Sequence, residues 1–148
     1  MKIYIGADHN GFSFKTQLGQ ILAAAGHEVV DTGDVTPDPK DDFPKFAGQV
    51  VTQLLADPDK EARGILICGS GQGMCMAANR FRGIRAALAW NVAEARASRN
   101  DDDANVLCLS SKYISLDEAK GIVATFLATP FAGAERFKRR IAELDQLG

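Results

Sequence analysis

The sequence predicts an α/β fold, a three-layer sandwich in which a five-stranded parallel sheet lies between two layers of helices. Short apolar runs alternate with segments of helical periodicity, and the 148 residues contain neither a repeat nor a linker. Parallel strands need crossover connections, which helices supply, so this alternation favours a parallel sheet. A single domain spanning residues 1–148 is expected, since domains of about 100–200 residues are common.

Five short apolar runs bounded by glycine or polar residues are typical of buried strands. They cover residues 2–7, 27–30, 64–68, 84–89 and 105–109. The first helix is predicted from apolar residues at helical spacing between Phe14 and Ala25, followed by Gly26. Ser115 and Glu118 form a capping box that opens another helix, which extends to about Leu127. The remaining helices are expected at 43–55, 74–80, 92–99 and 135–147, and the acidic, turn-rich segment 32–44 is expected to be one surface loop.

Composition excludes several classes of function. The formal charge of -2 does not suit a general binder of nucleic acid or of membrane surfaces. No apolar run approaches the roughly 20 residues of a membrane span, and the start of the chain lacks the pattern of a signal peptide. The 3 cysteines are odd in number and lack metal-ligand spacing, so a reduced, cytoplasmic setting is expected.

Two polar loops follow predicted strands. In open parallel sheets ligands bind at the carboxyl ends of the strands, so this rule selects residues 8–11 (DHNG) and residues 69–73 (GSGQG). A third polar segment, residues 99–104, precedes its strand instead. A neighbouring subunit would have to bring that segment to the same edge.

The glycine loop opens a predicted helix, where free backbone N–H groups favour an anion or a developing oxyanion, and this interpretation is preferred over a merely tight strand-to-helix turn. Its G-x-G-x-G spacing is neither the dinucleotide fingerprint nor a nucleophile elbow, and no Walker lysine follows. Cys68 stands at the mouth of this loop. A free cysteine is most often a small buried hydrophobe, but a thiol near a helix N-terminus can exchange a proton near neutral pH. Cys75 and Cys108 lack that placement and are expected in the core.

His9 and the C-terminal arginines each allow two interpretations. His9 could satisfy a turn, or it could contact a phosphate or hydroxyl at the binding edge. Arg136 and Arg140 lie one helical turn apart, so they could clamp a phosphate or form a solvated basic face.

Four segments together resemble the type B ribose-5-phosphate isomerase family, which also includes galactose-6-phosphate isomerase. They are IGADHNGF, ILICGSGQGMCMAANRFRGIRAA, SRNDDDANVL and the arginine-bearing C-terminal helix, in this order over almost the whole chain. The resemblance implies a Rossmann-like homodimer, which could pair further into a tetramer. It also implies interconversion of an aldose phosphate and a ketose phosphate without metal or nucleotide cofactor, at sites shared between subunits, with helix 135–147 packing on the partner.

The resemblance also assigns roles to residues. Cys68 matches the proton-shuttling cysteine of one branch of the family, while the glutamate used by another branch is Met74 here. Ser70 and the N–H groups of Gly71, Gln72 and Gly73 would stabilise the enediolate, with Gly69 in the same loop. The residues expected to bind substrate are Asp8 at the sugar hydroxyls, His9, Arg136 and Arg140 at the phosphate, and also Asp102 and Lys112.

One position departs from the family pattern. Members that act on furanose sugars carry a ring-opening histidine where this chain has Asp101. Asp101 could replace that histidine if Asp102 and Asp103 make it retain its proton, or the triple aspartate could be an exposed polar turn. Alternatively, the substrate needs no ring opening. A tetrose 4-phosphate cannot close a five-membered ring, so interconversion of erythrose and erythrulose phosphates is narrowly preferred here over that of ribose and ribulose 5-phosphates.

Two other classes of function stay open. A sugar-phosphate binding protein without catalysis would explain the missing histidine, although the retention of Cys68 and the glycine loop opposes it. A nucleotide-binding module of the same fold class is a more distant alternative.

Overall fold

All residues 1–148 are described by the structure, a computed structural model. Five strands form one sheet in the order β2-β1-β3-β5-β4, and all neighbours are parallel. The predicted parallel sheet is therefore confirmed. The strands are β1 Lys2–Ala7, β2 Glu28–Asp31, β3 Arg63–Cys68, β4 Ala86–Leu88 and β5 Val106–Ser110.

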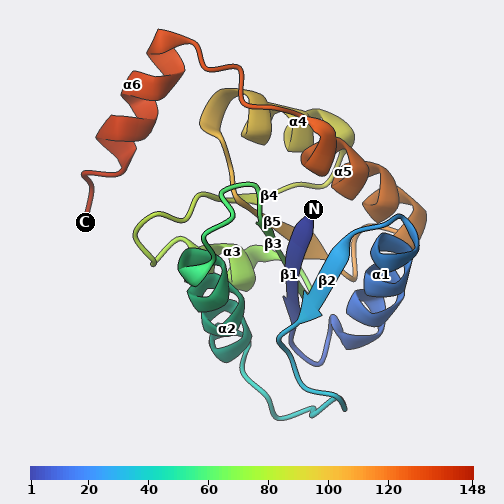
Figure 1. The fold of residues 1–148 in the computed structure, drawn as a ribbon. Coiled ribbons are helices and arrows are strands. Elements are labelled where there is room, and N and C mark those ends of the chain that lie inside the picture. The colour runs from blue at the N-terminus through green and yellow to red at the C-terminus, as the bar shows by residue number, and fades with distance from the viewer.

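Helices connect the strands and cover the sheet on both sides. They are α1 Phe12–Ala24, α2 Phe43–Ala56, α3 Gln72–Ala78, α4 Val92–Asp102, α5 Leu116–Ala128 and α6 Glu135–Leu144. α2 and α3 pack on one face, and α1, α4 and α5 pack on the other, which gives the three layers of a Rossmann-like sandwich (Figure 1). No helix is both long enough and apolar enough to cross a bilayer.

Strand alternation decides which face each β3 side chain enters, because successive side chains point to opposite faces. Ile65 and Ile67 pack into the core beneath α1, α4 and α5. Leu66 and Cys68 pack into the core beneath α2 and α3. The alternation therefore places the Cys68 thiol on the side of the sheet that carries α3.

The boundaries of α3 and β4 differ from the predicted ones. α3 runs from Gln72 to Ala78 rather than over 74–80, because Gly71 already serves as its N-cap and Asn79 leaves the helix. The Asn79 side chain accepts from the N–H of Ala86 and donates to its carbonyl, both at 2.9 Å. β4 begins at Ala86 rather than at residue 84, because Ile84 closes a turn with Phe81.

Several helix ends can be compared with the predictions. The Ser115–Glu118 capping box is confirmed, and Gly26 has the positive φ expected just beyond α1. α4 is longer than predicted, since Asp101 and Asp102 form its last turn rather than a polar turn outside it. α6 ends at Leu144, three residues before the predicted end at 147.

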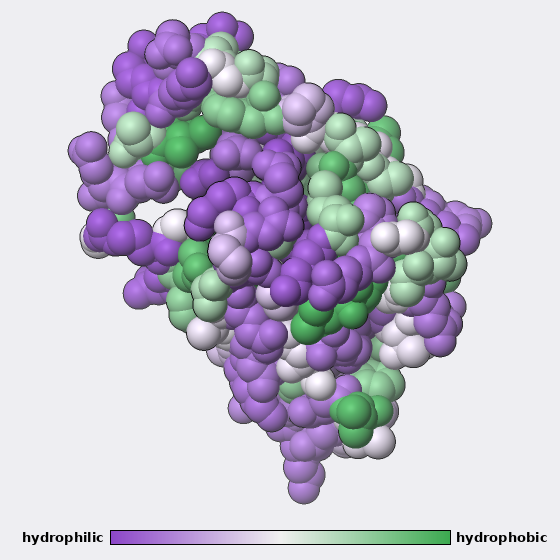
Figure 2. All heavy atoms as spheres, in the orientation of Figure 1, coloured by the Kyte–Doolittle hydropathy of each residue, from purple (hydrophilic) through white to green (hydrophobic).

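α6 stands apart from the sheet (Figure 1). Phe137 is its one buried residue, although Ile141 and Leu144 continue the same apolar stripe. The surface is hollowed between α6 and the body of the molecule (Figure 2). α6 therefore presents an amphipathic helix that its own chain covers only in part.

Candidate active site

The point where the sheet order reverses lies between β1 and β3. After β1 the chain continues to β2 on one side of this pair, and after β3 it continues to β4 and β5 on the other side. The loop after β1 and the loop after β3 therefore diverge. Ligand clefts of open α/β sheets form at such points. Asp8 follows β1 and Cys68 ends β3, and the N–H of Asp8 donates to the carbonyl of Ile67 at 3.4 Å. The two loops selected from the sequence therefore meet.

The thiol of Cys68 is buried and held by the glycine loop. Its Sγ accepts the N–H of Gly71 at 3.2 Å. Gly71 has φ 77°, and a Cβ there would lie 2.5 Å from Cδ1 of Leu88, so only glycine fits this bend. The bend therefore directs the N–H of Gly71 at the sulfur.

Two further groups in the loop can face a reacting oxygen. The Oγ of Ser70 accepts the N–H of Gln72 at 3.2 Å, which leaves the hydroxyl proton of Ser70 able to donate. The N–H groups of Gly73 and Met74 have no acceptor within the chain, as is usual in the first turn of a helix. Because the N–H groups of Gly71 and Gln72 are already bonded, Gly73 is the free donor among the three glycine-loop amides expected to stabilise an enediolate.

Asp8 and His9 form the second wall of the site. The buried Asp8 carboxylate accepts the N–H groups of Asn10 at 3.0 Å and Gly11 at 3.2 Å through one oxygen. The Nδ1 of His9 lies 2.6 Å from Oδ1 of Asp41, which also accepts the backbone N–H of His9 at 3.1 Å. This hydrogen bond to the Asp41 carboxylate raises the pKa of His9 above 6.5.

Asp8, His9 and Asp41 are also the group whose side chains could hold a metal ion. One ligand atom from each lies within 4.8 Å of the others. Nδ1 of His9 and Oδ1 of Asp41 are bonded to each other at 2.6 Å, so these two atoms already have a partner within the chain.

Lys112 reaches the site from the loop after β5. Its backbone N–H donates to the carbonyl of Gly69 at 3.1 Å, and its aliphatic chain packs against Gly69. The hydroxyl of Ser110 donates to the same carbonyl at 2.7 Å. The hydroxyl of Ser111 donates to the carbonyl of Asn10 at 2.8 Å, which ties this loop to the loop after β1.

The other two thiols lie outside this arrangement. Cys108 is fully buried, as expected, and its hydrogen bond with Cys75, followed by its burial, raises its pKa. Cys75 is only partly buried, and its hydrogen bond with Cys108 lowers its pKa to about 7. The Cys75 thiol nevertheless donates to the carbonyl of Ala86 at 3.4 Å, so it faces β4 rather than the glycine loop.

The expected segment around Asp101 lies at the opposite, amino-terminal edge of the sheet. Arg85, just before β4, donates to the carbonyls of Asp102 and Asp103 at 2.9 and 3.1 Å. The Asp103 carboxylate is paired with Arg85 at 3.2 Å and with Arg99 at 2.7 Å. Its charge is therefore offset, which removes one of the two carboxylates expected to act on Asp101.

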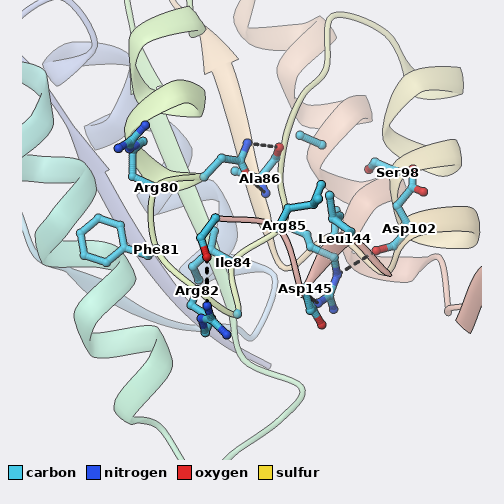
Figure 3. A pocket seen from close by; sticks show the side chains of 16 residues that line it. Arg80, Phe81, Arg82, Ile84, Arg85, Ala86, Ser98, Asp102, Leu144 and Asp145 are labelled. Carbon is cyan, nitrogen blue, oxygen red and sulfur yellow. Dashed lines mark hydrogen bonds and ion pairs between the residues drawn. The ribbon is translucent and has the colours of Figure 1, made fainter. Parts of the chain in front are cut away.

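A cavity of about 680 Å³ lies at this amino-terminal edge and not beside Cys68. Asp102 and Arg85 line it together with Leu144 and Asp145 from the C-terminal end (Figure 3). Arg136 stacks on the ring of Phe137 at 4.3 Å, and both Arg136 and Arg140 are exposed. Within one chain, Asp101, Asp102 and the two arginines thus make no contact with the Cys68 site.

Two residues near the site were missed from the sequence. In the sequence, Asp41 is one of several acidic residues in an expected surface loop. The clustering of acidic residues in that loop is the one sequence feature that points to Asp41. Phe43 begins α2, and its ring lies directly over Gly73 of the glycine loop. No local pattern distinguishes this aromatic residue from an ordinary core position.

Comparisons with known proteins agree with this geometry. The Ribose/Galactose Isomerase family matches residues 3–144. Ribose-5-phosphate isomerase B of Mycolicibacterium paratuberculosis is 39% identical over 141 residues, which cover 95% of this chain and 87% of that protein.

Solved structures extend the match. The ribose-5-phosphate isomerase B of Mycoplasma genitalium with bound ribulose-5-phosphate has a TM-score of 0.93 and 41% identity, covering 98% of this chain and 94% of that one. The enzyme from Thermotoga maritima has a TM-score of 0.93 and 42% identity, with coverage of 99% and 98%. The chain therefore belongs to the ribose/galactose isomerase family and is an aldose–ketose isomerase that acts on a sugar phosphate.

Proposed function

We propose that this protein interconverts ribose 5-phosphate and ribulose 5-phosphate with Cys68 as the base. The observation that carries the proposal is the Cys68 thiol, held by the Gly71 N–H at 3.2 Å beside the Asp8 loop. The relatives with this fold and about 40% identity bear the name of the pentose enzyme, and one of them holds ribulose-5-phosphate. These relatives favour the pentose over the tetrose that the sequence alone had narrowly preferred.

In the proposed reaction the Cys68 thiolate takes the C2 proton of the open-chain aldose. The electron pair of the broken C–H bond forms the C1–C2 double bond of an enediolate. The thiol then returns the proton to C1, while a proton moves from O2 to O1, so atoms and charge balance. The Ser70 hydroxyl and the free N–H of Gly73 stabilise the enediolate oxygens.

The remaining site residues bind the rest of the substrate in this proposal. Asp8 contacts sugar hydroxyls, and Lys112 adds positive charge from the loop after β5. His9 contacts the phosphate together with Arg136 and Arg140. Arginine suits this task because its planar guanidinium can donate two parallel hydrogen bonds.

In this proposal the protein is a homodimer. Each chain completes the Cys68 site of the other chain with its Arg136, Arg140, Asp101 and Asp102. Two observations support this arrangement: these residues lie away from their own Cys68, and on α6 Ile141 is only partly buried while Leu144 is 49% exposed. An amphipathic helix gains stability by burying its apolar stripe, and a partner surface could provide the cover.

A tetrose 4-phosphate remains a second candidate because of Asp101. Its carboxylate accepts a hydrogen bond from the side chain of Asn100 at 2.8 Å, and no histidine stands there to open a furanose ring. A tetrose 4-phosphate cannot form that ring, so it would not need a ring-opening histidine.

The test is a coupled isomerase assay that compares ribose 5-phosphate with erythrose 4-phosphate at neutral pH. The proposal predicts a higher kcat/KM for the pentose. Asp101→Asn is expected to slow the cyclic pentose if Asp101 opens the ring, and to leave the tetrose rate unchanged. A clear preference of the wild-type enzyme for the tetrose would contradict the pentose assignment. Binding without turnover of either sugar would point to a non-catalytic binding protein.

A further inference from the structure

We propose that Asp41 is a positioning residue for the isomerase reaction, holding the His9 ring with Nδ1 toward the loop before α2 and leaving Nε2 for the substrate phosphate. This inference deepens the proposed function and rests on the role of His9 given there. Its basis is the geometry of two segments that meet at His9, namely the loop after β1 and the acidic loop 32–42, together with the anchoring of that acidic loop by Lys15 of α1.

One carboxylate oxygen of Asp41 makes both contacts. Oδ1 accepts the backbone N–H of His9 at 3.1 Å and lies 2.6 Å from its Nδ1. A backbone and a side-chain hydrogen bond to the same acceptor fix both the position of the residue and the rotation of its ring. The side chain of Asp41 is 8% exposed and that of His9 is 31% exposed, so the carboxylate is covered while the imidazole faces solvent.

The loop that carries Asp41 is itself anchored. The Nζ of Lys15, in a side chain only 1% exposed, pairs with Asp31 at 2.9 Å and donates to the carbonyl of Asp34 at 3.4 Å. The N–H of Asp41 donates to the carbonyl of Asp38 at 3.0 Å in a turn. A buried ammonium group and a closed turn therefore hold Asp41 in place before any substrate arrives.

This arrangement also selects the form of the imidazole. When Nδ1–H donates to Asp41, the neutral ring presents Nε2 as an acceptor and the protonated ring presents Nε2–H as a donor. The hydrogen bond to Asp41 and, to a lesser degree, the charges of Asp41, Asp8 and Asp38 raise the pKa of His9, against the opposing effect of its partial burial. The raised pKa extends the donor form above pH 6.5, and a donor is what a phosphate oxygen needs.

Three variants distinguish the effect of the hydrogen-bond geometry of Asp41 from the effect of its negative charge. Asp41→Asn keeps the size and an acceptor oxygen but removes the charge, and Asp41→Ala removes both. Asp34→Asn is the matched control, because it removes a charge from the same loop while its side chain contacts only Lys45, at 3.7 Å. The chain contains 2 histidines, so the imidazole nitrogen resonances of His9 can be assigned and titrated by NMR against those of His27.

The expected result has two parts. The pKa of His9 falls toward 6.5 in both Asp41 variants and stays raised in Asp34→Asn. At pH 7.5 the KM for ribose 5-phosphate rises roughly tenfold in the Asp41 variants while kcat changes less than about threefold, and the KM difference narrows near pH 6, where His9 is protonated in every variant.

Inorganic phosphate provides a readout that does not depend on turnover. In the wild-type protein it should shift the Nε2 resonance of His9, and at the same concentration it should shift that resonance less in Asp41→Ala. An unchanged His9 titration in Asp41→Asn, a wild-type Nε2 resonance insensitive to phosphate, or equal KM changes in Asp41→Ala and Asp34→Asn would overturn the proposal. If ribose 5-phosphate is not the substrate, the wild-type assay fails while the titration and the phosphate shift remain.

Discussion

Both edges of the sheet carry candidate site residues, but the chain supports the two sets differently. At the carboxyl edge Cys68, Asp8 and His9 each have a hydrogen-bond partner in their own chain. At the amino-terminal edge and on α6, Asp102, Arg136 and Arg140 are exposed. The difference fits the proposed function, in which one chain preorganises the residues around Cys68 and the arginines proposed to bind phosphate act together with a second copy.

Among the variants considered, Cys68→Ala, at the carboxyl edge of the sheet, is expected to have the largest effect. Removal of a general base lowers kcat by about 10²–10⁴-fold, and KM should change little because the binding residues remain. The assay follows isomerisation of ribose 5-phosphate, with circular dichroism to verify the fold. Cys75→Ala is the matched control, since that thiol faces β4. Equal losses in the two variants would show that the Cys68 thiol has no special role.

Gly71→Ala tests whether the bend at the same edge is required. A Cβ at φ 77° would be strained and would overlap Leu88, so a loss of about 3 kcal/mol in the free energy of unfolding is expected from denaturant titration. Gly26→Ala is the control, because φ is 95° there but nothing lies within 4 Å of the added Cβ. It should lose only about 1–2 kcal/mol from backbone strain. Similar losses in both variants would mean that the contact with Leu88 is unimportant.

Tyr4→Phe is expected to have the smallest effect. Tyr4 belongs to a cluster with Lys2 and Asp57, whose polar groups bond to one another. The hydroxyl of Tyr4 donates to Asp57 at 2.6 Å, and Lys2 pairs with the same carboxylate at 3.1 Å. The hydrogen bond from Tyr4, followed by those from Asp59 and Lys2, lowers the pKa of Asp57 from 3.8 to about 2. The resulting stability is fully present above pH 3.8 and is lost as the pH falls through about 2.

In Tyr4→Phe the folded-state pKa of Asp57 should rise. The variant should therefore be less stable than the wild-type protein above pH 3.8, and the difference should shrink toward pH 2. Thermal unfolding across this pH range measures it. The kinetic constants at neutral pH should stay unchanged, and a raised KM would show that this cluster also supports the site.

Much of the fold followed from local patterns. The five strands and the Ser115–Glu118 capping box were predictable because burial on both faces produces short apolar runs and because caps have local sequence signals. The start of α3 was not, since it depends on the positive φ of Gly71, and the end of α3 depends on the contact of Asn79 with Ala86. Such contacts join residues that no periodicity relates.

The site divides in the same way. The proximity of Cys68 and Asp8 was predictable because Cys68 ends β3 and Asp8 directly follows β1, at the edge where parallel sheets bind ligands. Asp41 was not, because its contact with His9 crosses 32 positions in the sequence. The location of Asp101 away from the Cys68 edge followed from its place before β5 rather than after it. In the proposed homodimer its chemical role depends on which residues of the second copy face it, and the sequence of one chain does not specify them.

Complementation between two inactive variants tests the central claim most directly, namely that Cys68 of one chain works with the α6 arginines of another. Cys68→Ala and Arg140→Ala would be co-expressed with different tags, and doubly tagged protein and mixed preparations would be assayed with ribose 5-phosphate. In the doubly tagged heterodimer one of the two sites keeps both residues, so roughly half of the wild-type activity is predicted. Random pairing in a mixed preparation leaves about one site in four intact, so about a quarter is predicted there. Activity no greater than the sum of the separate variants would contradict the shared site.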